Sequence, residues 1–256
     1  MVNKINPTAL NVINNIKNFG SDAYNYTVNE HLERLLFTIS YIKNNTLVSD
    51  SILDIGSGTA FVPNFLSLEG YENITIIDIN DPPINADNKI NSHKLDIEED
   101  FLPFEDNSFN AILFLEVFEH LYKRPNHVFR EVYRVLKKDG ILIISTPNGG
   151  ITRKLIRLLA KGKFDMPIYD FSLIYEKLGH FGHIREYSVR EIKEYLKYFS
   201  FSIQKVLLNT FCTNEIDDNG RIYRSGSLFK KLYWRVCKIF HFLPIIQSNI
   251  LLIAKK

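Results

Sequence analysis

Small and acidic residues stand where three buried strands are expected to end. Asp54, Gly56 and Gly58 close the apolar run SILDIGSG, Asp78 closes a second apolar run, and Asp96 follows a third, shorter one. A glycine lets the backbone turn tightly and approach a ligand, and the amides of such a turn are hydrogen-bond donors. The spacing therefore predicts a single ligand site at one edge of a sheet.

The two later acids are placed to bind a nucleoside. In a doubly wound sheet, a carboxylate at the position of Asp78 accepts hydrogen bonds from the ribose hydroxyls. Asp96, at the same edge, could accept from an exocyclic adenine amine. A dinucleotide site would carry G-x-G-x-x-G, whose third glycine is here replaced by Phe61. The pattern therefore favours a cofactor with an amino-acid tail, whose cationic end Asp54 would attract.

Alternating apolar runs and amphipathic stretches must position these residues. This alternation predicts βαβ units, a mainly parallel sheet and right-handed crossovers. The expected strands are 51–58, 74–79, 92–95, 110–116, 141–147 and a late antiparallel pair, 201–208 and 249–255. The expected helices are 28–42, 60–68, 124–136 with Gly140 as its stop, and 188–199, where Ser188 and Glu191 form a capping box.

The predicted fold is a doubly wound α/β sheet of about seven strands. Residues 1–50 form an N-terminal helical cap, and 51–256 form the sheet domain. Residues 148–187 interrupt the alternation of strands and helices and are interpreted as an insertion on the substrate side of the sheet.

Four segments resemble the motifs of class I S-adenosylmethionine-dependent methyltransferases. ILDIGSGTAF resembles the glycine motif, with Ala60 in place of its third glycine, and TIIDIN resembles the acidic motif after the second strand. LDIEEDFLPFEDNSFNAILFLEVFEHL resembles the adenine-contacting segment. REVYRVLKKDGILIISTPN is similar to the fifth-strand motif of the type 11 and ubiquinone-biosynthesis-like subfamilies.

The resemblance covers 51–148 and implies a seven-stranded Rossmann-like fold. It also implies S-adenosylmethionine as cofactor and S-adenosylhomocysteine as product. The cofactor contacts that it implies are Asp54, Gly56, Ser57, Gly58, Asp78, Ile79, Leu95, Asp96, Ile97, Leu115 and Glu116.

Two histidine-bearing segments are candidates for the chemical step. LEVFEHL spaces Glu116, Glu119 and His120 as if on one helical face, which leaves open a general base at His120, a divalent-metal site or a structural role. GHFGHIREYS carries His180 and His183, which could take a proton from a hydroxyl acceptor or hold their loop closed. His183 and His120 are the candidate catalytic residues, and no metal ligand is assigned.

The N-terminal helices carry a further candidate group of polar residues. Tyr24, Tyr26, His31 and Arg34 are either part of a lid over the cofactor or ordinary helix surface. In the first case Arg34 would meet the cofactor's carboxylate.

The composition indicates the cellular compartment and the classes of binding partner. The net charge of +2 does not argue for nucleic acid, and Cys212 and Cys237 cannot build a disulfide framework, which favours a reducing cytoplasm. We expect neither a signal peptide nor a membrane span. Residues 221–256 hold eight Lys or Arg and no acid, so this basic region, with 153–163, is either a solvated face or a peripheral membrane contact.

The expected reaction is methyl transfer to a small-molecule, glycan-precursor or lipid-linked acceptor, with oxygen as the favoured acceptor atom. Two rivals remain open. One is a methyltransferase-like binding protein without catalysis, and the other is a nucleotide-binding oxidoreductase. The sequence leaves the oligomeric state undetermined.

Overall fold

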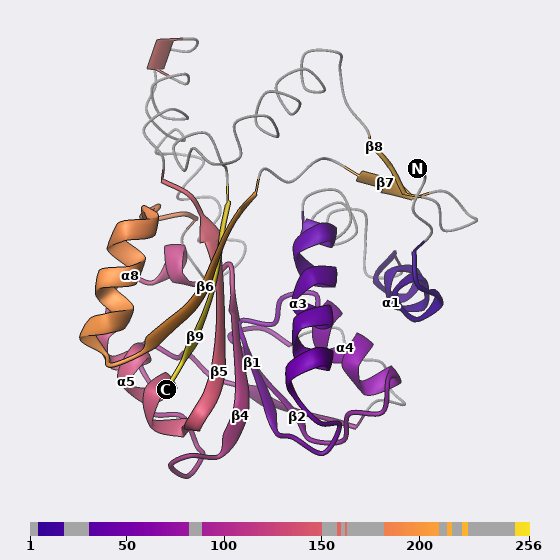
Figure 1. The fold of residues 1–256 in the computed structure, drawn as a ribbon, viewed down its shortest axis with the longest axis horizontal. Coiled ribbons are helices and arrows are strands. Elements are labelled where there is room, and N and C mark those ends of the chain that lie inside the picture. The colour runs from indigo at the N-terminus through magenta and orange to yellow at the C-terminus, as the bar shows by residue number, and fades with distance from the viewer. Residues whose placement is uncertain are drawn as a thin grey trace.

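The computed structural model describes residues 5–17, 31–81, 89–149, 158–159, 162, 182–209, 214–216, 222–224 and 249–256. Seven strands form one sheet in the order β3-β2-β1-β4-β5-β9-β6 (Figure 1). They are β1 Ile52–Ile55, β2 Ile74–Asp78, β3 Ile90–Lys94, β4 Phe109–Leu115, β5 Leu136–Pro147, β6 Ser202–Asn209 and β9 Asn249–Lys255. Strands β7 Asn214–Ile216 and β8 Ile222–Arg224 pair separately and were not predicted.

The central strands run parallel and the last strand reverses. Each of the neighbouring pairs from β3 to β5 is parallel, whereas β9 is antiparallel to both β5 and β6. The doubly wound fold and the late antiparallel pair are therefore confirmed.

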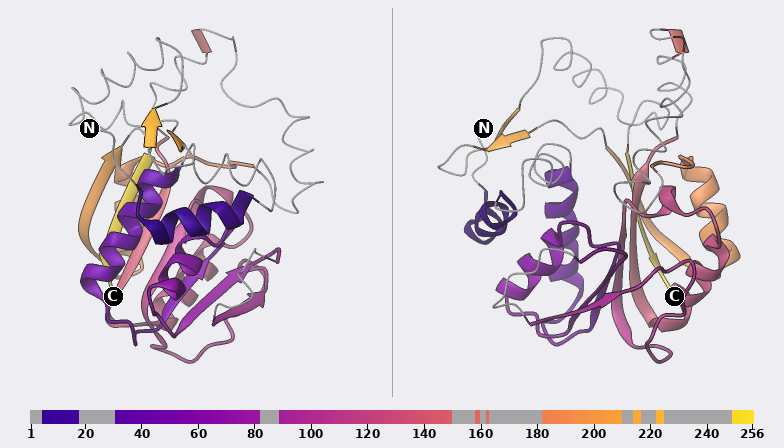
Figure 2. Two further views of the ribbon diagram at one scale, coloured as in Figure 1. Left: turned by 90° about the vertical axis from the view of Figure 1, so that its right-hand side faces the viewer. Right: turned by 180° about the vertical axis from the view of Figure 1, so that it is seen from behind.

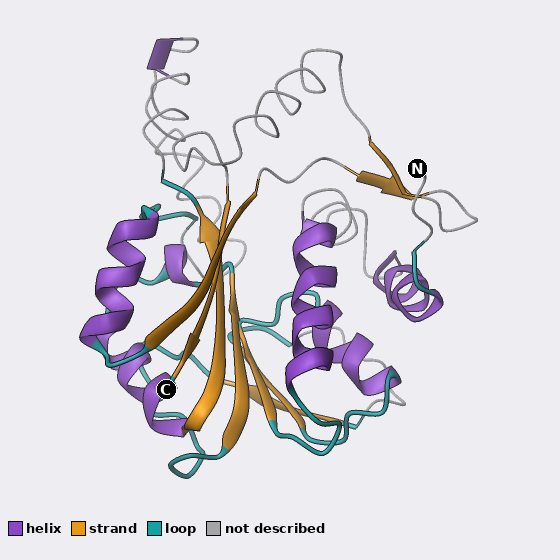
Figure 3. Ribbon diagram, in the orientation of Figure 1, coloured by secondary structure: helices purple, strands orange, loops and turns teal. Residues whose placement is uncertain are grey.

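Helices cover both faces of this sheet (Figures 2 and 3). Helices α1 Pro7–Lys17, α3 Leu32–Asn45 and α4 Phe61–Leu68 lie on one face, and α5 Pro125–Val135 and α8 Val189–Tyr198 lie on the other. A short 3-10 helix, η2 Phe118–His120, follows β4.

Successive strand residues enter two different apolar cores. Ile52 of β1 packs with α1, α3 and α4, whereas its neighbour Leu53 packs with α5 and α8. Leu113 and Ile112 of β4 divide in the same way. Because both faces are covered, the central strands read as continuous apolar runs in the sequence, which is what made them recognisable.

Local sequence signals set the helix termini. Pro125 occupies the first turn of α5, where its missing N–H has no intrahelical acceptor. Ser188 and Glu191 form the predicted capping box of α8, with the Ser188 amide 2.8 Å from the Glu191 carboxylate.

The boundary between α5 and β5 differs from the prediction. Helix α5 ends at Val135, and β5 begins at Leu136, which is extended and pairs with Phe109 of β4. Gly140 lies within β5 and does not stop the helix. A Cβ there would lie 2.8 Å from the Lys137 carbonyl oxygen, so the glycine permits a close backbone turn, which Asp139 enters with φ 62°.

Some predicted features lie outside the described residues. They include His180, Tyr24 and Tyr26, most of the insertion at 148–187, and most of the basic region at 221–256. None of the helices in the described part of the chain is both long and apolar enough to span a bilayer.

Candidate active site

A cavity of about 730 Å³ opens at the carboxyl ends of β1, β2 and β4. This volume falls in the range of small-molecule sites, about 300–1,000 Å³. All eleven residues predicted to contact a cofactor line it, as do His120 and His183. The remaining lining residues are Arg34, Leu35, Thr59, Phe61, Val62, Ile77, Asn80, Asp81, Glu98, Val117, Leu121, Tyr122 and Lys123.

The glycine turn after β1 forms one wall of the cavity. Gly56 and Gly58 have φ of 68° and 51°, and Ala60 is also left-handed at 50°. A Cβ on Gly56 would overlap the Val117 side chain, so this glycine permits close contact between the turn and the segment after β4. A Cβ on Gly58 would meet nothing within 4 Å. The turn at Gly58 therefore has open space beside it for a ligand.

Asp78 joins the tip of β2 to this turn. Its Oδ2 accepts from the Gly58 amide at 3.0 Å, and its Oδ1 accepts from the Asn80 amide at 3.0 Å. Each carboxylate oxygen can accept a second hydrogen bond. The side chain thus holds the turn in place and retains acceptor capacity toward the cavity.

Asp96 is held by its own loop. Its Oδ1 accepts from the Glu98 amide at 2.9 Å, and its Oδ2 lies 3.5 Å from the Lys123 ammonium. The Asp96 side chain is 41% exposed. One oxygen is therefore fixed by the backbone, while the other faces a cation on a flexible stem.

Asp54 is a buried carboxyl group of the cavity. Burial, and next the nearby Asp78 carboxylate, raise its pKa from 3.8 to about 8, against the opposing effect of Arg34. The group is therefore largely protonated at neutral pH in the ligand-free protein.

Arg34 reaches the cavity from α3. Its Nη1 lies 3.3 Å from Glu116 Oε1 and donates to Ser145 Oγ, and Ser145 in turn donates to Glu116 at 2.9 Å. Nearby His31 is also buried, and burial, Arg34 and His183 together lower its pKa to about 2. The predicted lid residues Arg34 and His31 are therefore part of the interior.

The segment LEVFEHL does not form the single helical face that its spacing suggested. Glu116 follows β4 with φ 58°, and only Phe118–His120 is helical, as a 3-10 turn. Glu116 and His120 line the cavity, whereas Glu119 is fully buried behind it and accepts from Thr146 at 3.0 Å. Burial, and next the Glu116 carboxylate, raise the pKa of Glu119.

The two candidate catalytic histidines lie together. Their rings form an edge-to-face contact with centroids 5.1 Å apart. The Nε2 atoms of His120 and His183 lie 4.0 Å and 3.9 Å from Glu119 Oε1.

Sequence reasoning missed several residues of this region. Ser145, Tyr122 and Lys123 were not singled out, nor was Glu98, which accepts hydrogen bonds from three consecutive backbone amides at 122–124. One signal that could have identified Ser145 is the polar pair Ser145-Thr146, which follows the apolar run ILII near the carboxyl end of a strand. The carboxyl ends of parallel strands face the ligand in a doubly wound sheet.

The cavity is acidic and contains unpaired buried polar atoms. Six of its described lining residues carry carboxyl groups, and two, Arg34 and Lys123, carry permanent cations. Arg34 Nε and Ser57 Oγ are buried without a hydrogen-bond partner among the described residues. Buried polar atoms normally have hydrogen-bond partners, so the cavity is suited to a polar ligand. Because carboxyl groups outnumber cations in its lining, the cavity favours a ligand that carries positive charge.

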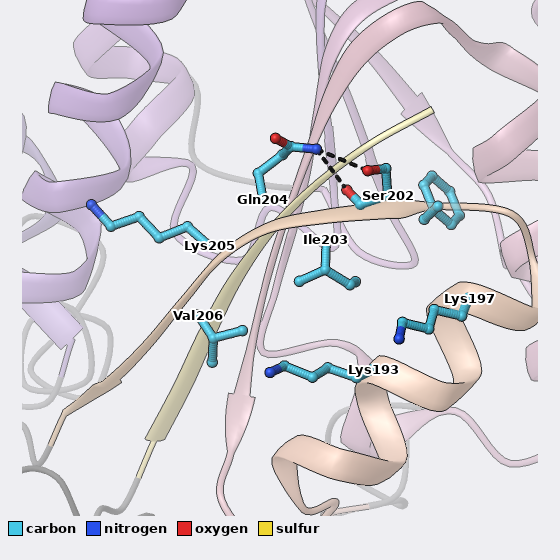
Figure 4. A pocket seen from close by; sticks show the side chains of 8 residues that line it. Lys193, Lys197, Ser202, Ile203, Gln204, Lys205 and Val206 are labelled. Atoms are coloured by element: carbon cyan, nitrogen blue, oxygen red, sulfur yellow. Dashed lines mark hydrogen bonds between the residues drawn. The ribbon is translucent and has the colours of Figure 1, made fainter.

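A second hollow, of about 500 Å³, lies between α8 and β6 (Figure 4). Ser202 of β6 lines the hollow and pairs with Lys255 of β9. Lys255 in turn pairs with Ile141, where the pairing of β5 with β9 begins. This end of the sheet is opposite to the carboxyl ends of the parallel strands. Half-buried Lys193 and exposed Lys197 border the hollow, so we assign it no part in the candidate site.

Comparisons with known proteins agree with this geometry. Residues 53–144 match the family model described as a methyltransferase domain. Over 117 residues the chain is 35% identical to the uncharacterized protein MJ1252 of Methanocaldococcus jannaschii, covering 45% of this chain and 44% of that protein. Over 93 residues it is 29% identical to the mitochondrial arginine-hydroxylase NDUFAF5 of Danio rerio, covering 36% of this chain and 29% of that one.

The fold itself is shared with solved methyltransferases. A SAM-dependent methyltransferase from Archaeoglobus fulgidus has a TM-score of 0.53 at 18% identity, covering 87% of this chain and 94% of that chain. The matches to the two curated relatives span less than half of their length.

The family match and the sheet order point to the same assignment as the motifs at 51–148. The matched residues run from β1 into β5, and these strands carry the cavity. Residues 53–144 therefore match a methyltransferase domain, within a sheet that has the fold of solved SAM-dependent methyltransferases.

Proposed function

We propose that the chain binds S-adenosylmethionine in this cavity and transfers its methyl group to an oxygen of a small-molecule, glycan-precursor or lipid-linked acceptor. The observation that carries the proposal is the cavity itself, where the glycine turn, Asp54, Asp78 and Asp96 share one acidic wall. S-adenosylmethionine carries a sulfonium and an ammonium group, and an acidic cavity favours such a ligand.

The cavity supports a definite orientation of the cofactor. Asp78, at the tip of β2, would accept hydrogen bonds from the ribose, and Asp96, with Leu95 and Ile97, would face the adenine. Asp54 would lie near the cationic amino end. Arg34, whose Nε is unpaired among the described residues, would donate to the tail carboxylate.

The bound cofactor supplies an activated methyl group. The protein's part is then to align the acceptor in line with the bond that breaks and to exclude water. As the acceptor oxygen bonds to the methyl carbon, the sulfonium becomes a thioether and the acceptor loses its proton. His183 and His120 face the cavity and are our candidates to receive this proton.

The two rivals are weaker but testable. A nucleotide-binding oxidoreductase would need room for an anionic pyrophosphate beside the helix after β1. There Phe61 is 2% exposed, and the wall is acidic. A methyltransferase-like binding protein without catalysis would keep this cavity and bind the cofactor without turnover.

Calorimetric titration with S-adenosylmethionine and S-adenosylhomocysteine tests the proposal. We expect micromolar binding, about −8 kcal/mol, and a loss of at least about tenfold in Asp78→Ala. Asp139→Asn is the control, because Asp139 is exposed at the end of the sheet that is opposite to the cavity. Equal affinity of wild type and Asp78→Ala would refute the role of Asp78.

Two further outcomes separate the rivals. Binding of NAD(H) without binding of S-adenosylmethionine would establish the oxidoreductase. Binding of S-adenosylmethionine without methyl transfer to any acceptor of the three proposed classes would favour the binding protein.

A further inference from the structure

We propose that Glu119, His120 and His183 form a binding site for a divalent first-row transition-metal ion. One nitrogen of each imidazole and one carboxylate oxygen lie within 4.8 Å of one another. Two neighbouring residues come from η2, and the third comes from the segment that precedes α8.

The Glu119 carboxylate is the main argument for a ligand at this point. The residue is fully buried, and its Oε2 is engaged by the Thr146 hydroxyl at 3.0 Å. Its Oε1 is buried with no hydrogen-bond partner among the described residues, and it points toward the two imidazole Nε2 atoms, 4.0 Å and 3.9 Å away. A buried carboxylate oxygen without a partner is unfavourable, and a cation bound between these three groups would satisfy it.

The surrounding structure fixes the two segments against each other. The backbone amides of Ile184 and Arg185 both donate to the Glu119 carbonyl oxygen, at 2.9 Å and 3.3 Å. Phe118 and Tyr187 stack with ring centroids 4.2 Å apart. The juxtaposition of His183 with η2 is therefore supported by residues on both sides of it in the sequence.

A carboxylate also lies near the second nitrogen of the His183 imidazole. Its Nδ1 lies 3.9 Å from the Glu186 carboxylate, while its Nε2 faces Glu119. Carboxylates commonly orient the second nitrogen of a metal-binding imidazole and raise its basicity. The arrangement thus has one nitrogen for the metal and one for an orienting acid.

The donor set selects the class of ion. Two imidazole nitrogens and one carboxylate suit Zn²⁺, Mn²⁺, Fe²⁺ or Co²⁺, whereas Mg²⁺ and Ca²⁺ prefer oxygen ligands. Around an ion at about 2.1 Å, tetrahedral ligands lie about 3.4 Å apart. Side-chain rotations that move the three donor atoms by about 1 Å would reach this geometry from the spacing in the structure.

Three protein ligands leave coordination positions open, and these face the candidate active site. His120 and His183 line the cavity, whereas Glu119 lies behind them. Glu116 is a neighbour but no ligand, because its carboxylate is already bonded to Arg34 and Ser145. If the proposed methyl transfer holds, an acceptor oxygen bound at an open position would lose its proton more readily, to solvent, and His120 and His183 would then hold the ion instead of accepting that proton.

Metal titration of the full chain tests the site without any turnover. After treatment with a chelator, Zn²⁺ and Mn²⁺ are titrated by calorimetry, and Co²⁺ is followed by its visible d–d absorption. We expect one ion per chain, and an affinity about tenfold or more lower in His183→Ala and in His120→Ala. The His183 side chain is 46% exposed, so its replacement is compatible with folding, which circular dichroism would verify.

Two controls make the result decisive. His93→Gln changes a histidine on edge strand β3, where its ring contacts Phe104, and should leave metal affinity unchanged. Glu119→Gln keeps the size of the side chain but removes its charge, and should weaken binding like the histidine variants. Absence of stoichiometric binding of all three ions, or equal binding by wild type, His183→Ala and His120→Ala, would overturn the site. Failure of methyl transfer alone would not.

Discussion

Arg34 and Glu116 form an ion pair inside the protein, with Nη1 and Oε1 3.3 Å apart and side chains only 2% and 6% exposed. Arg34 belongs to α3, and Glu116 follows β4 at the edge of the cavity. The pair therefore links the packing of α3 to the shape of the candidate site.

Removing one partner of this pair leaves the other charge buried. We expect Arg34→Met to lower the free energy of unfolding by about 3 kcal/mol. The double variant Arg34→Met, Glu116→Gln should lose less than the sum of the two single variants, because no uncompensated charge remains. Urea unfolding measures all four proteins.

The exposed pair Arg190 and Glu194 is the matched control for this cycle. Its side chains are 88% and 62% exposed, and Arg190→Met should change stability by less than about 0.5 kcal/mol. Strictly additive losses at Arg34 and Glu116 would show that the two charges are not coupled.

Asp54 should make stability depend on pH. Its folded-state pKa of about 8 lies above the ordinary value of 3.8, so the unfolded chain loses this proton first as pH rises. The stability associated with the protonated group is complete below about pH 4 and is lost as pH rises to about 8. Asp54→Asn should therefore gain thermal stability relative to wild type across this window.

Melting temperatures at several pH values, without cofactor, measure this difference. Asp139→Asn, at an exposed carboxyl on the opposite edge of the sheet, is the control. A difference between Asp54→Asn and wild type that stays constant from pH 5 to pH 8 would contradict the buried, protonated state of Asp54.

The fold was readable from the sequence because its signals are local. Strands β1 and β4 are buried on both faces and therefore appear as apolar runs, and the capping box of α8 lies within four residues. Gly140 was misinterpreted for the converse reason. A glycine after a helix resembles a stop, but the distant pairing of Leu136 with Phe109 ends α5 earlier and starts β5.

The candidate site was only partly readable for a related reason. The glycine turn, Asp78 and Asp96 each sit at a strand end, where the pattern fixes their location. The contact between Glu119 and His183 joins residues far apart in the chain, and no local periodicity encodes it. The spacing of Glu116, Glu119 and His120 even suggested an α-helix, because the left-handed backbone of Glu116 leaves no trace in the residue types.

The two glycines of the turn should respond differently to alanine. Gly58→Ala meets no neighbour within 4 Å, so its main cost is the left-handed backbone, about 1 kcal/mol. Gly56→Ala adds an overlap with Val117, and we expect a loss of about 3 kcal/mol. Denaturant unfolding of both variants compares them directly.

Relief of the overlap distinguishes packing from backbone strain in Gly56→Ala. Adding Val117→Ala removes the Cγ atoms that the new methyl group would meet, and should restore part of the lost stability. No restoration would mean that strain at φ 68° alone accounts for the loss.

Glu98 should stabilise the loop that carries part of the cavity wall. It is 5% exposed, and its Oε1 accepts from the Tyr122, Lys123 and Arg124 amides at 3.0, 2.8 and 2.8 Å. These amides directly precede α5, whose N-terminal dipole favours a negative charge. Glu98→Ala leaves all three without this acceptor and should cost about 3 kcal/mol.

Two variants separate the hydrogen bonds of Glu98 from its charge. Glu98→Gln can keep a carbonyl oxygen in the Oε1 position and should lose only about 1 kcal/mol. Glu99→Ala removes the exposed neighbouring acid, which contacts Lys123 Nζ at 2.6 Å, and should be nearly neutral. Because Tyr122 and Lys123 line the cavity, Glu98→Ala should also weaken cofactor binding. Equal stability of Glu98→Ala and Glu99→Ala would show that the three buried amides find other acceptors.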